Sequence, residues 1–150
     1  PIGSVLLTEK CCRSDPISDV DYKNLIGAIE AVLKNHRTIV PSYHRTMIAT
    51  AGTATTLAGI KMKMKVYKHQ EVHGSKISLD DLKKIIAELK SKTIEERKKI
   101  PGLEPGRADV ILAGSLLLEK ITEHLGIQEI TVSDRGVRWG VVYERLSAFT

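Results

Sequence analysis

The feature that most constrains this chain is the stretch from Met47 to Gly59, which reads MIATAGTATTLAG. Its apolar start is typical of a buried strand, and small and hydroxyl residues follow before the pattern turns helical. Such a strand, turn and helix start present backbone N–H groups to an anion, and glycine lets the backbone approach it closely. The simpler alternative is a helix that Thr53 caps with its hydroxyl. The residues predicted to contact a phosphate or nucleotide here are Gly52, Thr53, Ala54 and Thr55.

Length and composition favour one domain and are compatible with an anionic partner. With 150 residues, 42% of them apolar, the chain is long enough to bury a core. Lys and Arg outnumber Asp and Glu by 23 to 18, and the resulting net charge of +5 suits an anion. Aromatic residues make up only 4%, which argues against base stacking and therefore against a nucleic-acid partner. No apolar run reaches the length of a membrane span, so we expect no membrane association.

Cysteine and histidine usage predicts neither a disulfide nor a metal site. Cys11 and Cys12 are adjacent and point apart in a strand, so we interpret them as reduced thiols of a cytoplasmic protein. His69 and His73 lie four apart, but no acidic or cysteine cluster joins them. The chain begins with Pro1 rather than Met, from which we expect that an N-terminal part is missing.

Hydrophobic periodicity and capping residues predict alternating strands and helices. The predicted strands cover residues 2–8, 47–50 and 130–132. The predicted helices cover residues 18–37, 53–65, 78–89, 93–100, 106–125 and 136–146, with a connector at 70–77. This order predicts a three-layer α/β fold: a mainly parallel sheet with helices on both faces, plus a helical insertion at about 78–100.

Ligands of such sheets bind beyond the carboxyl ends of the strands. Two predicted turns lie there, at residues 51–56 and 133–138. In the second turn, two guanidinium groups follow a strand end beside a glycine, which suits bidentate phosphate binding. The alternative is a surface ion pair between an aspartate and an arginine. The predicted phosphate- or nucleotide-binding residues of this turn are Asp134, Arg135, Gly136 and Arg138.

Other polar residues receive structural interpretations. We expect Arg107 to pair locally and Asp109 to gain from the dipole of the helix that it begins. Ser133 is not predicted to be a nucleophile, because the sequence indicates no histidine paired with it. The lysines at 61, 63, 65 and 68 fit a solvated face or, alternatively, a surface that guides a long polyanion.

Taken together, these motifs resemble the exopolyphosphatase / guanosine pentaphosphate phosphohydrolase family, over nearly the whole chain. The motifs that support the resemblance, in order, are Gly52-Thr53-Ala54-Thr55-Thr56-Leu57-Ala58, Val72-His73-Gly74, Glu96-Arg97, Gly102-Leu103-Glu104-Pro105, Arg107-Ala108-Asp109-Val110-Ile111, Ala113-Gly114 and Val132-Ser133-Asp134-Arg135-Gly136-Val137-Arg138.

The resemblance implies a lobe of the actin-like ATPase (ribonuclease H-like) fold. The chain would be most of the second, C-terminal lobe (residues 1–150), with the first lobe, its Gly-rich phosphate loops and the catalytic Glu preceding Pro1. It implies a hydrolase that releases terminal phosphate from polyphosphate or guanosine pentaphosphate, with Mg²⁺ held outside this chain. No catalytic or metal residue is then expected here. The implied partners are polyphosphate or guanosine pentaphosphate/tetraphosphate, the missing lobe, and a second copy in a homodimer or other self-association.

Two positions depart from the family pattern. The family usually has Gly where this chain has Ala51, and an acidic residue where it has Trp139. Two alternatives remain open: a kinase lobe of the same fold, and a non-catalytic sensor of polyanions or alarmones.

Overall fold

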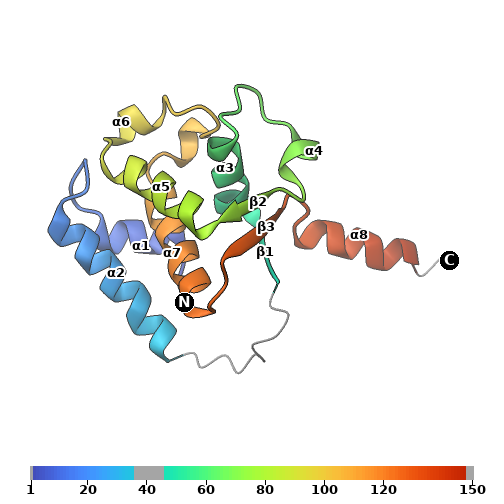
Figure 1. Ribbon diagram of the computed structural model, residues 1–150, viewed down its shortest axis with the longest axis horizontal. Helices are drawn as coiled ribbons and strands as arrows, with labels where there is room; N and C mark the ends of the chain where they lie inside the picture. Colours follow the sequence, from blue (N-terminus) through green and yellow to red (C-terminus); the bar gives the residue numbers. More distant parts are fainter. Residues whose placement is uncertain (1, 36–45, 148–150) are drawn as a thin grey trace.

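The computed structural model describes residues 2–35 and 46–147 (Figure 1). Its elements, in order, are α1 (Ser4–Cys11), α2 (Asp19–Lys34), β1 (Met47–Thr50), α3 (Ala51–Lys61), α4 (His69–Val72), β2 (Lys76–Ser78), α5 (Leu79–Lys90), α6 (Ile94–Arg97), the 3-10 turn η1 (Pro105–Arg107), α7 (Ile111–His124), β3 (Glu129–Ser133) and α8 (Val137–Ser147).

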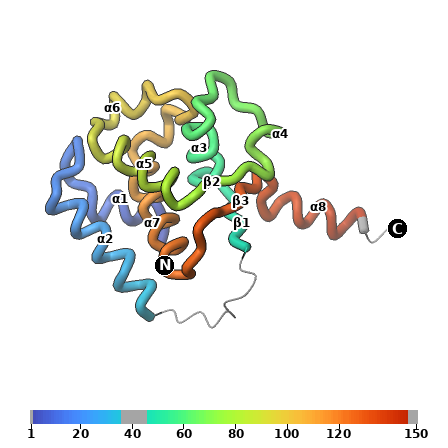
Figure 2. Tube along the Cα trace, viewed as in Figure 1, coloured from blue at the N-terminus to red at the C-terminus, as the bar shows by residue number. Residues whose placement is uncertain are grey.

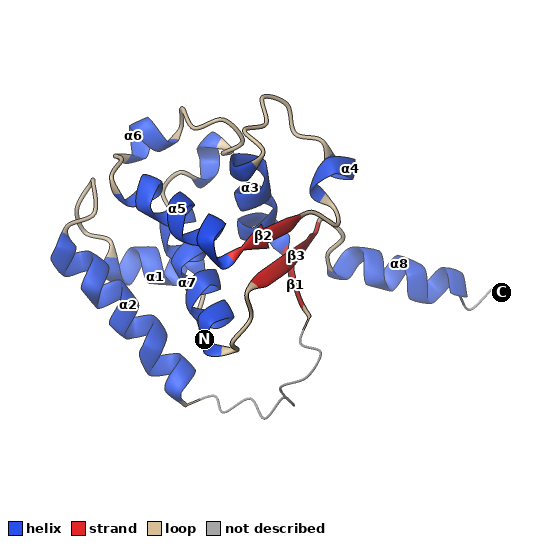
Figure 3. Ribbon diagram, in the orientation of Figure 1, coloured by secondary structure: helices blue, strands red, loops and turns tan. Residues whose placement is uncertain are grey.

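The three strands form one small sheet in the order β1-β3-β2 (Figure 3). β1 pairs with β3 in parallel, so that Thr50 lies beside Ser133 at the carboxyl ends of both strands. β2 pairs with β3 antiparallel, with Ile77 opposite Ile130. In the described residues the sheet is therefore mixed, whereas the sequence predicted a mainly parallel one. β2 was missed because its three residues lie in the predicted connector.

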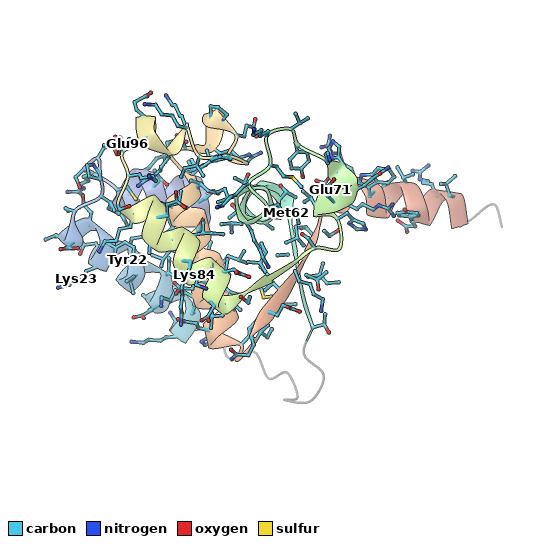
Figure 4. The ribbon with its side chains drawn as sticks, turned by 45° about the horizontal axis from the view of Figure 1, so that its top comes forward. Tyr22, Lys23, Met62, Glu71, Lys84 and Glu96 are labelled. Carbon is cyan, nitrogen blue, oxygen red and sulfur yellow. The ribbon has the colours of Figure 1, made fainter. Side chains whose placement is uncertain are left out.

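Helices cover one face of this sheet. α3 contacts all three strands, and α5 contacts β2. This face carries the buried side chains of Ala49, Ile77 and Val132. On the other face Ile48 is 63% exposed, so the described residues do not show the second helical layer that the sequence predicted. α7 lies at the centre of the helical part and contacts α1, α2, α3 and α5, and α8 projects away from the rest of the fold (Figures 1 and 4).

Capping residues set the helix starts as predicted. The Ser18 hydroxyl accepts a hydrogen bond from Asp21 N and begins α2. Ser78 begins α5, and Thr93 begins α6, each with a capping box that satisfies two backbone donors. The predicted strand at 47–50 and the predicted helix at 136–146 are confirmed as β1 and α8. The predicted end of α2, near residues 36–37, lies outside the described residues.

Other predicted elements were wrong. The predicted strand at 2–8 is the helix α1, because Leu7 packs into the core formed with α7 while Val5 stays exposed. The predicted helix at 53–65 begins two residues earlier and ends at Lys61, and Lys63 adopts a positive φ of 49° beyond it. The predicted helix at 106–125 is split into η1 and α7.

A glycine pair brings the segment before η1 against α3. A β-carbon added at Gly59 would lie 2.7 Å from the carbonyl oxygen of Gly102, and one added at Gly102 would lie 2.0 Å from that of Gly59. Gly102 also has a positive φ of 88°. The two backbones can meet because neither residue has a side chain. Figure 2 shows this segment passing beside α3, and Figure 4 marks Met62 just after α3 and Glu71 on α4.

Candidate functional site

The candidate site lies where the carboxyl ends of β1 and β3 meet the start of α3. A cavity of about 460 Å³ opens there. α3, the segment after it, the turn before α7 and the end of β3 all contribute to its wall. The lining residues are Thr55, Thr56, Met64, Lys65, Tyr67, Gly102, Leu103, Glu104, Arg107 and Asp134.

The turn between β1 and α3 is tight. Ala51 has a positive φ of 70°, a left-handed conformation in which a β-carbon is strained. Thr50, not Thr53, is the residue before the helix, and no side chain caps it. The alternative of a helix capped by Thr53 is therefore wrong. The first amides of α3 precede the first helical hydrogen bonds, so they lack helical acceptors.

The predicted residues of this turn point to different sides of α3. The Thr55 hydroxyl lies at the cavity and is 3.3 Å from the carbonyl oxygens of both Ala51 and Gly52. The side chain of Thr53 packs instead on Gly114 of α7, and Ala54 is buried in the core. Of the four predicted residues, Thr55 thus lines the cavity, and Gly52 lies against Arg107, which also lines it.

Arg107 lies directly against Gly52. A β-carbon added to Gly52 would be 2.1 Å from Arg107 Nη1 and 2.4 Å from Cζ. Arg107 Nε donates to Glu104 Oε2 at 2.9 Å, so the predicted local pairing is confirmed. Its position at the start of α3 was not predicted from the sequence. Both residues stand in the quoted motifs, but nothing in their spacing indicates that residues 55 apart meet.

Asp134 joins β3 to the segment around α4. Its Oδ1 accepts a hydrogen bond of 3.0 Å from the Tyr67 hydroxyl, and its Oδ2 contacts His69 Nδ1. Burial, followed by this hydrogen bond to a carboxylate, raises the pKa of Tyr67 to about 12. The tyrosine hydroxyl therefore stays protonated and donates. Neither Tyr67 nor His69 was predicted to be at the site, because the lysine-rich pattern around them indicates a solvated face or a surface that guides a polyanion, and nothing about these two side chains.

The other residues of the second turn lie toward α8. Arg135 donates to the Tyr143 hydroxyl, and its guanidinium lies 5.4 Å from the centre of the Trp139 ring. Trp139, one of the two departures from the family pattern, thus holds Arg135 by a cation–π contact. Arg138 is exposed on α8 and Gly136 is half-buried at its start. In this structure Arg135 and Arg138 are not among the residues that line the cavity.

Ser133 does have a histidine nearby, contrary to the prediction. Its hydroxyl is 3.5 Å from His73 Nδ1. The same hydroxyl donates to the Arg135 carbonyl oxygen at 3.0 Å and accepts from the Arg135 amide at 3.2 Å. This turn occupies the hydroxyl, so Ser133 serves the backbone rather than nucleophilic chemistry.

The cavity does not fit a magnesium ion by itself. Mg²⁺ takes several oxygen ligands in octahedral geometry. Asp134 is already engaged by Tyr67 and His69, and Glu104 by Arg107. Within residues 2–35 and 46–147, no group of three or more His, Cys, Asp or Glu side chains could hold a metal ion. Over the same residues, no helix is long and apolar enough to cross a membrane.

Known proteins share this sequence and fold. The model of the Ppx/GppA phosphatase family matches residues 1–149. Exopolyphosphatase 2 of Mycobacterium tuberculosis is 32% identical over 145 residues, which are 93% of this chain and 46% of that protein. A bifunctional 3-dehydroquinate synthase/phosphatase of Fusobacterium nucleatum is 30% identical over 95% of this chain and 22% of its own length.

The fold agrees with these matches. The crystal structure of the Aquifex aeolicus Ppx/GppA family member superposes with a TM-score of 0.91 and 32% identity, over 100% of this chain and 48% of that one. The chain thus spans about half the length of the exopolyphosphatase and of the solved structure, and a C-terminal lobe is consistent with that coverage. The α/β fold is that of an actin-like ATPase lobe, and the chain belongs to the Ppx/GppA phosphatase family.

Proposed function

We propose that this chain is the phosphate-binding C-terminal lobe of a hydrolase that releases terminal phosphate from inorganic polyphosphate. The observation that supports it best is the start of α3, where amides without helical acceptors lie beside a cavity of about 460 Å³ and the Arg107 guanidinium. Family membership and the exopolyphosphatase relative agree with this proposal.

Each turn has a role in the proposal. The backbone from Gly52 to Thr55 binds phosphate oxygens at the positive end of the α3 dipole. The second turn adds positive charge through Arg135 and Arg138, which lie outside the residues that line the cavity. Asp134 and Gly136 complete this binding set by holding the turn in place, Asp134 through its contacts with Tyr67 and His69. Phosphoryl transfer depends on such positioning and charge neutralisation.

The chain's own residues supply binding rather than the chemical step. We propose that the carboxylate that orients the attacking water, and the ligands of Mg²⁺, belong to a first lobe outside this sequence. When bound, Mg²⁺ would neutralise phosphate charge there. Guanosine pentaphosphate is the second candidate substrate, in line with membership of the Ppx/GppA phosphatase family, and guanosine tetraphosphate is a further candidate binding partner. We further propose a cytoplasmic location, which fits the two free thiols Cys11 and Cys12.

Phosphate release tests the proposal directly. The full-length protein that contains this chain is incubated with Mg²⁺ and either polyphosphate or guanosine pentaphosphate, and the phosphate released is measured. We expect turnover of polyphosphate, and we expect Gly52→Val to abolish binding while circular dichroism stays unchanged. If neither substrate is hydrolysed but polyphosphate binds tightly, the protein is a sensor rather than an enzyme.

A further inference from the structure

We propose that His69 sets the affinity of the candidate site for phosphate by carrying a proton that offsets the charge of Asp134. The inference rests on the proposed function and concerns how that same site is regulated. His69 acts through Asp134, so it is a positioning residue and not a ligand of the substrate. The binding of a polyanion then takes up a proton at His69.

The first step is a conflict of charge in the cavity wall. Asp134 lines the cavity, and its side chain is only 19% exposed. A carboxylate and a phosphate are both anions, and their repulsion is screened little where solvent has poor access. The charge of Asp134 must therefore be offset before a polyanion binds tightly in this cavity.

The second step identifies the group that can offset this charge. The Tyr67 hydroxyl donates to Asp134 Oδ1, but the pKa of Tyr67 is about 12, so it stays a neutral donor at ordinary pH. His69 Nδ1 contacts Oδ2 of the same carboxylate. Among the ion pairs of the described residues, Asp134 takes part in one, and its partner is His69. A full positive charge reaches the carboxylate only when both nitrogens of this ring are protonated.

Backbone pairing keeps the histidine in this position. Gly74 N donates to Val132 O at 2.8 Å, and Val132 N donates to Ser75 O at 2.8 Å, so the segment after α4 is held on β3 (Figure 1). The ring of His69 also packs edge-on against the ring of Tyr67, with 4.9 Å between their centres. The His69 side chain is otherwise 79% exposed, so it can exchange protons with solvent.

The charged groups around His69 are paired with one another. α4 contacts α3, whose lysine, Lys61, pairs with Asp81 at 2.8 Å. Beside His69 along the chain, Lys68 and Glu71 pair with each other at 2.7 Å. These two pairs leave the charge of the carboxylate at the cavity unchanged.

The titratable and charged groups on the cavity side and at the end of β3 also have other partners. Arg107 pairs with Glu104, Arg135 contacts Tyr143 and Trp139, and His73 contacts the Ser133 hydroxyl. Lys65 adds a positive charge to the cavity wall, but among the described residues it makes no ion pair with Asp134. Within the described part of the chain, protonation of His69 is therefore the change that neutralises this carboxylate.

Linkage makes this arrangement measurable. Histidine changes charge between about pH 5 and 8. Because protonated His69 favours an anion in the cavity, the anion favours protonated His69 by the same factor. The contribution of His69 to the affinity is present at the acidic end of this range and is lost as the pH rises.

The test is a calorimetric titration of the full-length protein with tripolyphosphate, without Mg²⁺ so that the ligand is not hydrolysed. Titrations at about pH 6 and about pH 8, each in two buffers with different heats of ionisation, give the affinity and the number of protons taken up. His69→Gln should weaken binding about fivefold or more at the lower pH and by less than about twofold at the higher pH. The wild type should also take up more protons than the variant. Both proteins bind the same ligand, so the ionisation of tripolyphosphate itself cancels in the comparison.

A second variant tests the route through the carboxylate. Asp134→Asn keeps an oxygen for the Tyr67 hydroxyl but removes the negative charge, so it should bind tripolyphosphate more tightly than the wild type at the higher pH. Adding His69→Gln to Asp134→Asn should change the affinity by less than about twofold, because no charge is left to offset. His124→Gln is the matched control, since His124 is exposed at the end of α7 and does not line the cavity. It should behave as the wild type does at both pH values, and thermal unfolding checks that each variant is folded.

Two results would overturn this inference alone. Equal proton uptake by the wild type and His69→Gln means that His69 is not linked to binding. Weaker binding by a folded Asp134→Asn variant at the higher pH means that the carboxylate supports phosphate binding instead of opposing it. In both cases, a protein that releases phosphate from polyphosphate with Mg²⁺ leaves the proposed function intact. A wild type that neither binds tripolyphosphate nor releases phosphate overturns the proposed function together with this inference.

Discussion

The Tyr67 hydroxyl donates a hydrogen bond of 3.0 Å to Asp134 Oδ1, joining the segment before α4 to the end of β3. Burial and this carboxylate hold the pKa of Tyr67 at about 12, above its ordinary value of 10. The folded state therefore keeps the phenolic proton more tightly than the unfolded state does. The stabilisation is fully present below pH 10 and is lost as the pH rises toward 12.

Tyrosinate absorbance in an alkaline titration measures this shift. The difference between the wild type and Tyr67→Phe should titrate near pH 12. Asp134→Asn should lower that pKa, because it removes the nearby negative charge, while the contribution of burial keeps it above 10. A Tyr67 that titrates at its ordinary value would contradict the contact with Asp134.

The fold should be less stable with alanine at position 51 than with glycine there. The φ of 70° at Ala51 costs about 1–2 kcal/mol in an L-residue. Glycine removes this strain, but it also raises the conformational entropy of the unfolded chain, which reduces the net gain in stability. Ala51→Gly should therefore stabilise the fold by about 0.5–1 kcal/mol, measured by urea unfolding. Ala54→Gly, on the buried side of the same helix, should instead destabilise it by about 1 kcal/mol or more. A destabilised Ala51→Gly variant would contradict the left-handed conformation.

Asp81 should give the fold an acid-sensitive contribution. The Lys61 ammonium at 2.8 Å, together with hydrogen bonds from Ser78, lowers the pKa of Asp81 from 3.8 to about 2. Its stabilisation is present above about pH 4 and is lost as the pH falls to about 2. Asp81→Asn should lower the free energy of unfolding by about 1 kcal/mol at neutral pH. The difference in stability between this variant and the wild type should disappear near pH 2. Asp80→Asn, in the same helical turn, is the control and should change stability by less than about 0.5 kcal/mol.

Gly59 should tolerate no side chain. A β-carbon there would lie 2.7 Å from the backbone carbonyl of Gly102, and backbone cannot move aside as a flexible side chain can. Gly59→Ala should destabilise the fold by about 2 kcal/mol or more, measured by thermal or urea unfolding. Gly27→Ala, exposed in the middle of α2 with nothing within 4 Å, should stabilise it by about 0.5–1 kcal/mol. Equal effects at both positions would mean that α3 and the Gly102 segment are not in contact.

The 150-residue chain on its own should self-associate. In the described residues, β1 pairs with a strand on one side only, and Ile48 is exposed next to that open edge. Open strand edges pair with other chains, and a charge on the edge opposes this. Sedimentation across a concentration series should show association that Ile48→Lys reduces. We expect no phosphate release by this chain alone, so a monomer that hydrolyses polyphosphate would contradict both expectations.

The sequence by itself determined the elements whose signals are local. The hydroxyl caps Ser18, Ser78 and Thr93 bond to amides three residues later, so their spacing alone sets three helix starts. The turn at Ala51-Gly52 likewise follows from a short apolar run that ends in small residues. The family was also readable, because its motifs recur in order along the chain.

Tertiary structure alone decided what local patterns leave ambiguous. The apolar run of α1 suits a strand as well as a helix, and only packing against α7 makes it helical. The same limit applies to the site. Gly52 meets Arg107, and Tyr67 meets Asp134, only because the chain folds back over 55 and 67 residues. No periodicity encodes these contacts: they depend on the placement of α3 between the sheet and the turn before α7, which the buried core fixes as a whole.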